Sequence, residues 1–357
     1  MKKIITTVLV LTAVFCVASC NKNNPVKHGD GTIIPRITEV STKAPIVTTE
    51  NFASLYGSFK MDIFNTVDYY DASGLVTGRH YVSDMTVNWA GPGTESSTGV
   101  YWISETPLRF WFQAPASLIA DGGTKTVTTP TETSETMSFT YANAAPKAAG
   151  TDGTYHDAEY QDDIVFAYNY KEWEKDVTDD YIDITFKHAL AAVKFVIYTD
   201  DDSFATDMLR LQTVTLTDIA SSADFVFNPL ATTPDGLFTV SNQANVVTYH
   251  QSISNADISR TASNATDYAT TDAAKKVFMM IPQTLGADSK LELVLAHSNG
   301  TPDDTSDDFN IRTSASIAGD TWKPGHVYKY KLKASANTEQ IRFEVTLEDW
   351  TNVNINL

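Results

Sequence analysis

Short runs of β-branched and aromatic residues recur along almost the whole chain from about Ile37 onward, separated by clusters of Gly, Asp, Asn, Ser and Pro. Almost no window shows an apolar repeat of helical period. Many short strands at roughly regular spacing, with turn residues between them, are typical of antiparallel β-sandwiches. The pattern therefore predicts an all-β chain made of two consecutive antiparallel β-sandwich domains, with little helix.

The expected strands fall into two groups with a polar run at 172–180 between them. In the first half they cover 54–65, 80–89, 100–104, 107–113, 136–141 and 163–170. In the second half they cover 181–199, 211–218, 223–228, 246–250, 275–281, 290–297, 326–333 and 340–350. The Thr-rich segment 121–135 is expected to be a surface loop or hairpin tip.

The N-terminus has the features of a bacterial lipoprotein signal peptide. Lys2 and Lys3 precede an apolar stretch at 4–18, and small residues lead to Cys20. The apolar stretch is too short to remain as a membrane span, so we expect residues 1–19 to be removed and Cys20 to carry the lipid. The alternative is a signal peptide cut elsewhere, with Cys20 as an ordinary thiol.

The chain of 357 residues is longer than one hydrophobic core usually supports, which favours two domains after the signal. Residues 20–36 form a polar tether that includes a candidate removable N-terminal strand. The first sandwich is predicted at 37–178 and the second at 179–357. Because no cysteine follows Cys20, neither sandwich can contain a disulfide.

The composition and the motifs exclude several classes of function. A formal charge of −18, spread along the chain, repels phosphate backbones and anionic lipids. We therefore expect no nucleic-acid partner, and membrane contact only through the lipid on Cys20. The seven histidines are scattered, and no phosphate loop, dinucleotide fingerprint or nucleophile elbow is present. The chain is predicted not to be an enzyme and to need no cofactor or metal, although calcium binding by the acidic runs at 200–202 and 303–308 stays open.

Three local features have a physical interpretation of their own. The apolar alternation in 186–197 changes phase at Ala191-Ala192, which predicts a β-bulge, and His188 on its apolar face is expected to be a core histidine bonded to backbone carbonyls. Pro324-Gly325 predicts a type II turn. Trp322 and Trp350 are expected to be packing anchors of a sandwich.

An ordered set of motifs gives the chain a resemblance to a known family. The motifs are LRFWFQAP at 108–115, DIVFA at 163–167, ITFKHALAAVKFVI at 184–197, FMMIPQ at 278–283, TWKPGHVYKYKL at 321–332 and VTLEDW at 345–350. Together with the lipoprotein signal, this set resembles the fimbrillin family, the subunits of type V pili of Gram-negative gut and oral anaerobes. The resemblance implies sandwiches of the transthyretin-like kind.

The resemblance also implies a route of assembly. Family members are exported as lipoproteins, and a trypsin-like or arginine-specific protease removes an N-terminal strand. The exposed groove then accepts a strand from the next subunit. On this expectation Arg36 is the first candidate for cleavage and Lys43 the second. The candidate donor strand is 351–357, with Val353, Ile355 and Leu357 as its apolar face.

The implied function is a structural subunit of an adhesive fimbria on the outer membrane and cell surface, with other pilus subunits and the processing protease as partners. A seven-residue tail spans only about 23 Å. Stalk, tip, accessory and anchor positions therefore stay open. The alternative is a monomeric surface lipoprotein that binds glycan or host protein through the aromatic residues Trp102, Phe110, Trp111 and Phe112.

Overall fold

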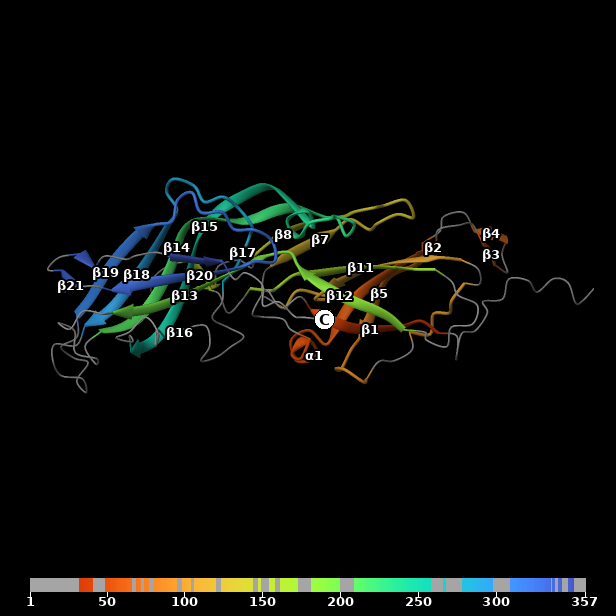
Figure 1. Ribbon diagram of the computed structural model, residues 1–357, viewed down its shortest axis with the longest axis horizontal. Coiled ribbons are helices and arrows are strands. Elements are labelled where there is room, and N and C mark those ends of the chain that lie inside the picture. Colours follow the sequence, from red (N-terminus) through yellow and green to blue (C-terminus); the bar gives the residue numbers. More distant parts are fainter. Residues whose placement is uncertain are drawn as a thin grey trace, which may run out of the picture.

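A computed structural model gives the fold of the chain. The residues that it describes are 32–40, 49–65, 69–71, 74–76, 80–94, 98–103, 106–119, 123–143, 147–148, 154–157, 161–172, 181–199, 209–257, 266–267, 278–297, 309–334, 336–337, 340–341 and 346–349. The molecule is elongated and consists almost wholly of strands, which confirms the all-β prediction (Figure 1). No helix among these residues is long and apolar enough to cross a membrane.

The first sheet contains six described strands in the order β1-β12-β11-β6-β2-β5. Their bounds are β1 (Ile34–Val40), β2 (Ser58–Asn65), β5 (His80–Asn88), β6 (Leu108–Ala114), β11 (Val165–Lys171) and β12 (Tyr181–His188). The short helix α1 (Phe52–Leu55) precedes β2, and its Phe52 is buried among the aromatic side chains of the sheet. A small ribbon of β3 (Tyr69–Asp71) and β4 (Gly74–Val76) follows β2.

Two further sheets build the rest of the molecule. The eight-stranded sheet contains β7 (Thr124–Val127), β8 (Met137–Ala142), β9 (Lys147–Ala148), β10 (Thr154–Asp157), β14 (Leu209–Phe227), β15 (Phe238–Asp257), β18 (Lys290–His297) and β19 (Phe309–Ser316). The five-stranded sheet contains β13 (Ala191–Thr199), β16 (Thr266–Asp267), β17 (Phe278–Met280), β20 (Val327–Ala334) and β23 (Thr346–Asp349). A 3₁₀ turn, η3 (Pro234–Gly236), precedes β15, and β21 (Ala336–Asn337) pairs with β22 (Gln340–Ile341).

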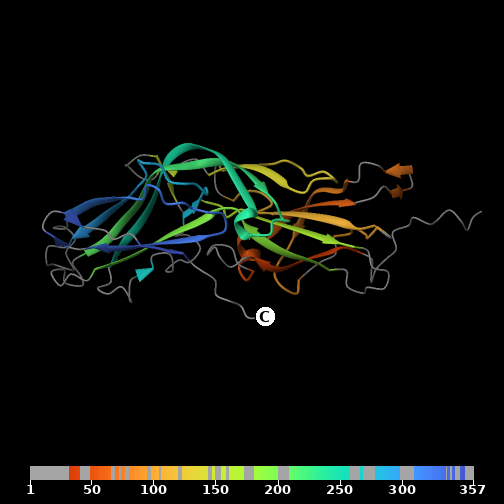
Figure 2. The same ribbon diagram turned by 45° about the horizontal axis from the view of Figure 1, so that its top comes forward.

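The long strands β14 and β15 belong to both sandwiches. They pair with each other along almost their whole length and run from one half of the molecule into the other (Figure 1, Figure 2). Phe225, Phe227 and Phe238 at one end lie in the core of the first sandwich, whereas Leu211 and Leu216 lie in the core of the second. The first sandwich is thus closed by strands from the second half of the sequence.

The sheets therefore do not divide at the predicted boundary between 178 and 179. Strand β12 follows that boundary but lies in the first sheet, between β1 and β11. The first core combines residues from both halves of the sequence, whereas every residue of the second core comes from the second half.

The predicted β-bulge at Ala191-Ala192 is wrong. The chain leaves the first sheet after His188, passes through Ala189 and Leu190, and enters the five-stranded sheet at Ala191. The phase of the apolar alternation changes because the strand changes sheet, so its two segments face different cores.

Other local predictions are confirmed. Trp322 is 1% exposed, and its indole Nε1 donates to the Tyr330 hydroxyl at 3.0 Å. Gly325 has a φ of 66°, as the predicted turn requires. Trp350 lies outside the described residues, as do the acidic runs at 200–202 and 303–308.

The dependence of the first core on the second half of the sequence can be tested with Phe225→Ala. The Phe225 ring stacks on Phe139 at a centroid distance of 4.6 Å and is 1% exposed. Its loss should lower the free energy of unfolding by about 3–5 kcal/mol, measured by urea denaturation. Val226→Ala at the neighbouring, half-buried position is the control and should cost about 1 kcal/mol or less. Equal effects of the two variants would contradict the shared core.

Candidate assembly site at the edge of the first sheet

Strand β1 forms one edge of the first sheet. It pairs in parallel with β12, from Ile34 opposite Tyr181 to Val40 opposite Phe186. The preceding residues continue into the domain, because the Ile33 amide donates to Val100 O at 2.7 Å and the Thr98 amide donates to Ile33 O at 3.2 Å. The segment 32–40 is therefore built into the first sandwich.

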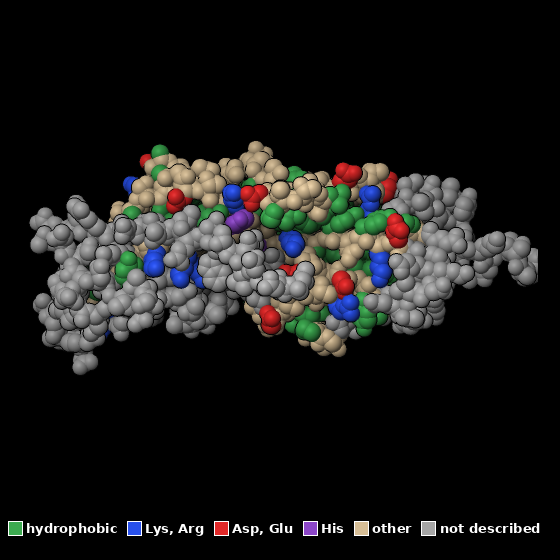
Figure 3. Space-filling view, viewed as in Figure 1, with side chains coloured by type: hydrophobic (Ala, Val, Ile, Leu, Met, Phe, Trp, Pro, Cys, Tyr) green, Lys and Arg blue, Asp and Glu red, His purple; other side chains and the backbone are tan. Residues whose placement is uncertain are grey.

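Apolar side chains hold this segment in place. Ile33, Pro35 and Ile37 alternate toward the core and are buried, and Val40 is buried after an irregularity in the register between Ile37 and Glu39. Burial of Ile33, Ile37 and Val40 contributes roughly 1.5–3 kcal/mol for each side chain. Over the face that carries β1 and β12, hydrophobic groups alternate with Lys, Arg, Asp and Glu (Figure 3). Removal of β1 would expose both the apolar surface that it covers and the backbone edge of β12.

Arg36, the first candidate for cleavage, lies in the middle of β1. Its guanidinium is 2.7 Å from the Asp183 carboxylate on β12 and lies 4.4 Å from the centroid of the Tyr181 ring. The predicted boundary between the removable segment 20–36 and the domain thus passes through a paired strand. Lys43, the second candidate, lies outside the described residues, three positions after β1 ends.

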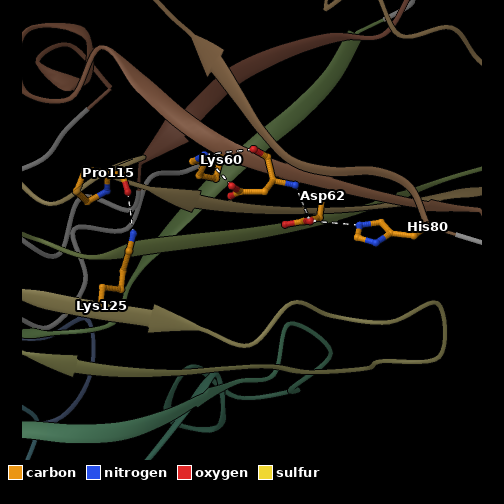
Figure 4. Close-up of polar contacts among 6 residues, drawn as sticks. Lys60, Asp62, His80, Pro115 and Lys125 are labelled. Atoms are coloured by element: carbon orange, nitrogen blue, oxygen red, sulfur yellow. Dashed lines mark hydrogen bonds and ion pairs between the residues drawn. The ribbon is translucent and has the colours of Figure 1, made fainter.

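The opposite edge of the sheet, β5, is irregular. The register between β2 and β5 shifts twice, and Asp84 has a φ of 51°. Asp62 Oδ1 accepts a hydrogen bond from the Asp84 amide at 3.0 Å, and Lys60 Nζ lies 3.0 Å from Asp84 Oδ2. His80 Nε2 is 3.4 Å from Asp62 Oδ1, and Figure 4 shows these side chains along the edge. Bulges and charges of this kind discourage pairing with another strand.

Lys125 on β7 is the described lysine with the largest change in acidity. Its Nζ donates to Pro115 O at 2.7 Å, which ties the β7–β8 hairpin to the end of β6 (Figure 4). Burial disfavours the charged ammonium and lowers the pKa of Lys125 to about 8, an effect that the Asp162 carboxylate opposes. No sequence pattern singled out this residue, because its environment comes from distant segments.

His188 is buried, as predicted, but a carboxylate lies against it. Its Nδ1 is 2.8 Å from Asp163 Oδ2, and both side chains are inaccessible to solvent. Tyr56 donates a hydrogen bond to the Asp163 carbonyl oxygen. The prediction of backbone carbonyl partners therefore missed Asp163, which precedes β11 in the sequence. The pair joins the end of β12 to the segment before β11 and, within the described residues, belongs to no group of metal-binding side chains.

The aromatic residues proposed for glycan binding are not available at the surface. Trp102 is 4% exposed, and Phe110, Trp111 and Phe112 are fully buried. Strand β6 is buried on both faces, because Phe110 and Phe112 pack toward Trp102 and Phe59, whereas Trp111 packs against Tyr168 and Phe227. A platform made of these rings is excluded.

The C-terminal strand runs toward the first sandwich. Strand β23 pairs antiparallel with β20, and Asp349 lies opposite Tyr328. That end of β20 adjoins the junction, since the Gly325 amide donates to Leu190 O at 2.9 Å. The predicted donor residues Val353, Ile355 and Leu357 lie outside the described residues, as does Cys20.

Comparisons with known proteins find a matching family model and similar solved structures. A family model described as fimbrillin-like matches residues 66–350. A fimbrial protein from Bacteroides vulgatus ATCC 8482 is similar in structure, with a TM-score of 0.51 and 14% identity over 90% of this chain and 99% of the other. A candidate cell adhesion protein from Bacteroides ovatus ATCC 8483 aligns with a TM-score of 0.46 and 11% identity, covering 89% and 97% of the two chains. No protein of curated function matches the sequence.

The acidity of Lys125 predicts a specific pH dependence of stability. Between about pH 8 and pH 10.5 the folded chain has released the Lys125 proton while the unfolded chain retains it, so the contribution of Lys125 to the free energy of unfolding rises with pH. The slope from one proton is at most about 1.4 kcal/mol per pH unit. Urea denaturation from pH 7 to pH 10 should show that Lys125→Met removes this rise, while Lys290→Met, at an exposed position, preserves it. Parallel curves for the wild type and Lys125→Met would refute the assignment.

Proposed function

The chain belongs to the fimbrillin-like family, and on that premise we propose that it is a structural subunit of an adhesive fimbria at the cell surface. It is exported as a lipoprotein on Cys20, activated by proteolysis and assembled by exchange of strands between subunits. This assigns it a structural role and no catalytic one. Its partners are other pilus subunits and a trypsin-like protease.

The observation that carries the proposal is the edge position of β1. The strand lies at the end of the first sheet, near the N-terminus, and buries alternate apolar side chains against a continuous seam. Its loss would leave β12 with an unpaired edge, which is the condition for adding an extended segment. The bulged β5 edge is a poorer acceptor.

The position of β1 also distinguishes the two candidate cleavage sites. A cut after Arg36 requires local unfolding of a paired strand and leaves Ile37 and Val40 in place. A cut after Lys43 releases the whole of β1 together with the lipidated N-terminus. We therefore propose Lys43 as the productive cleavage site and Arg36 as a secondary one.

The C-terminal tail has the pattern needed to replace β1. Ile33, Pro35 and Ile37 occupy three inward positions at a spacing of two residues, and Val353, Ile355 and Leu357 offer three apolar side chains at the same spacing. Because donor and acceptor lie at different places on one subunit, the contact is head-to-tail and continues into a filament.

Trypsin treatment of the purified chain tests the proposal. Wild-type protein should be cut after Lys43 and should then form SDS-resistant ladders on gels and filaments in electron micrographs. Lys43→Ala should reduce ladder formation at least about tenfold, because β1 then remains attached. Arg36→Ala should have little effect on assembly.

Lys290→Ala provides the matched control, since it removes an exposed lysine on β18, far from β1 in the fold. If Arg36→Ala alone abolished assembly, the productive cleavage would lie after Arg36, within β1, and the assignment to Lys43 would be wrong. Ladders formed by the Arg36→Ala/Lys43→Ala double variant would disprove activation by proteolysis.

A further inference from the structure

The outer face of the eight-stranded sheet contains a hollow that the assembly route does not use. It lies over β15, β14, β18 and β19 in the second sandwich and has a volume of about 650 Å³. The opposite face of the same strands is apolar and buried, with Leu216, Tyr249 and Leu293 in the second core. A volume of this size is within the range of sites for small ligands, roughly 300–1,000 Å³.

The strand register places polar groups side by side across the floor. His250, Thr215, Glu292 and Ser314 lie opposite one another on four adjacent strands, about 4.8 Å apart from strand to strand. Thr215 is only 9% exposed, and its hydroxyl lies 3.2 Å from His250 Nδ1. Thr215 therefore forms the floor of the hollow.

The walls carry exposed groups whose hydrogen-bonding capacity is unused. Glu292, Asn310 and Arg312 are exposed, and no hydrogen bond or ion pair within the described part of the chain engages their side chains. A carboxylate accepts hydrogen bonds, a guanidinium donates them, and an amide does both. Donors and acceptors thus converge on one concave surface.

We propose that this hollow binds a neutral oligosaccharide of two or three sugar rings. The hydroxyl groups of a sugar both donate and accept, which matches the mixture of Glu292, Arg312, Asn310 and the floor threonine. One acidic and one basic side chain offset each other, so the hollow lacks the excess positive charge that a sulfated or phosphorylated ligand needs, and the chain carries −18 overall. The lining contains no aromatic ring other than the His250 imidazole, so it offers no pocket for the aromatic anchor of a peptide.

A sugar site without aromatic rings for stacking binds its ligand weakly. Many copies of the site along one filament would compensate for the low affinity of each. If subunits polymerise as proposed above, each contributes one hollow, and many weak contacts add up along the filament. Only this amplification rests on the proposed function. The binding itself is a property of the single subunit.

The test uses the purified full-length mature chain, uncleaved and displayed at high density on beads. The beads are applied to an array of neutral, sialylated and sulfated oligosaccharides. We expect binding to neutral di- and trisaccharides, reduced at least about tenfold by Arg312→Ala, Glu292→Gln and Thr215→Val. Thr215→Val keeps the β-branched shape, so it removes the hydroxyl without disturbing the strand.

Two matched variants control for surface changes elsewhere. Thr239→Val and Glu39→Gln alter exposed residues on β15 and β1 outside the hollow and should bind like the wild type. Absence of binding to every neutral sugar, or binding that the three hollow variants leave unchanged, would overturn the proposal. Retention only on sulfated or sialylated sugars would overturn it in favour of an anionic ligand. None of these outcomes depends on cleavage or on filament formation.

Discussion

The antiparallel pairing of β14 with β15 is the constraint on which the rest of the structure depends. These two strands supply Phe225, Phe227 and Phe238 to one core and Leu211 and Leu216 to the other. A long antiparallel ladder, with three shifts of register along it, therefore joins the two sandwiches. The first sandwich cannot complete its core without the ends of β14 and β15, which supply Phe225, Phe227 and Phe238.

The two edge strands of the first sheet, β5 and β1, differ in the regularity of their backbone. At β5, Asp62 and Lys60 hold the irregular backbone around Asp84, which spoils the regular row of donors and acceptors that another strand would need. At β1 the register is regular up to Ile37, and the apolar seam beneath it is continuous. On the proposed route, this asymmetry makes β1 the more favourable edge for the exchange of a strand.

The sequence predicted the fold class and many strands because alternation of apolar and polar residues is a local signal. Strand β18 was found with its observed bounds, Lys290–His297, and the turn at Gly325 follows from Pro-Gly chemistry. The continuity of β14 was missed because irregularities between Leu216 and Ile219 and between Ser222 and Asp224 interrupt its periodicity. The partner of His188 and the acidity of Lys125 depend on contacts between distant segments, which no local pattern encodes. The edge position of β1 was anticipated only in part, since Arg36 lies inside the strand and not after it.

Pro35 gives the precursor a further property. Proline has no backbone N–H, so a strand that contains it is a poor template for a neighbour and is tolerated mainly at the edge of a sheet. The charged Arg36 beside it adds to this effect. In a newly exported subunit, β1 would thus both cover the apolar groove and hinder premature association with another subunit. On the proposed route, a single proteolytic cut removes β1 and at the same time exposes the groove along β12. Polymer growth can therefore begin only after secretion.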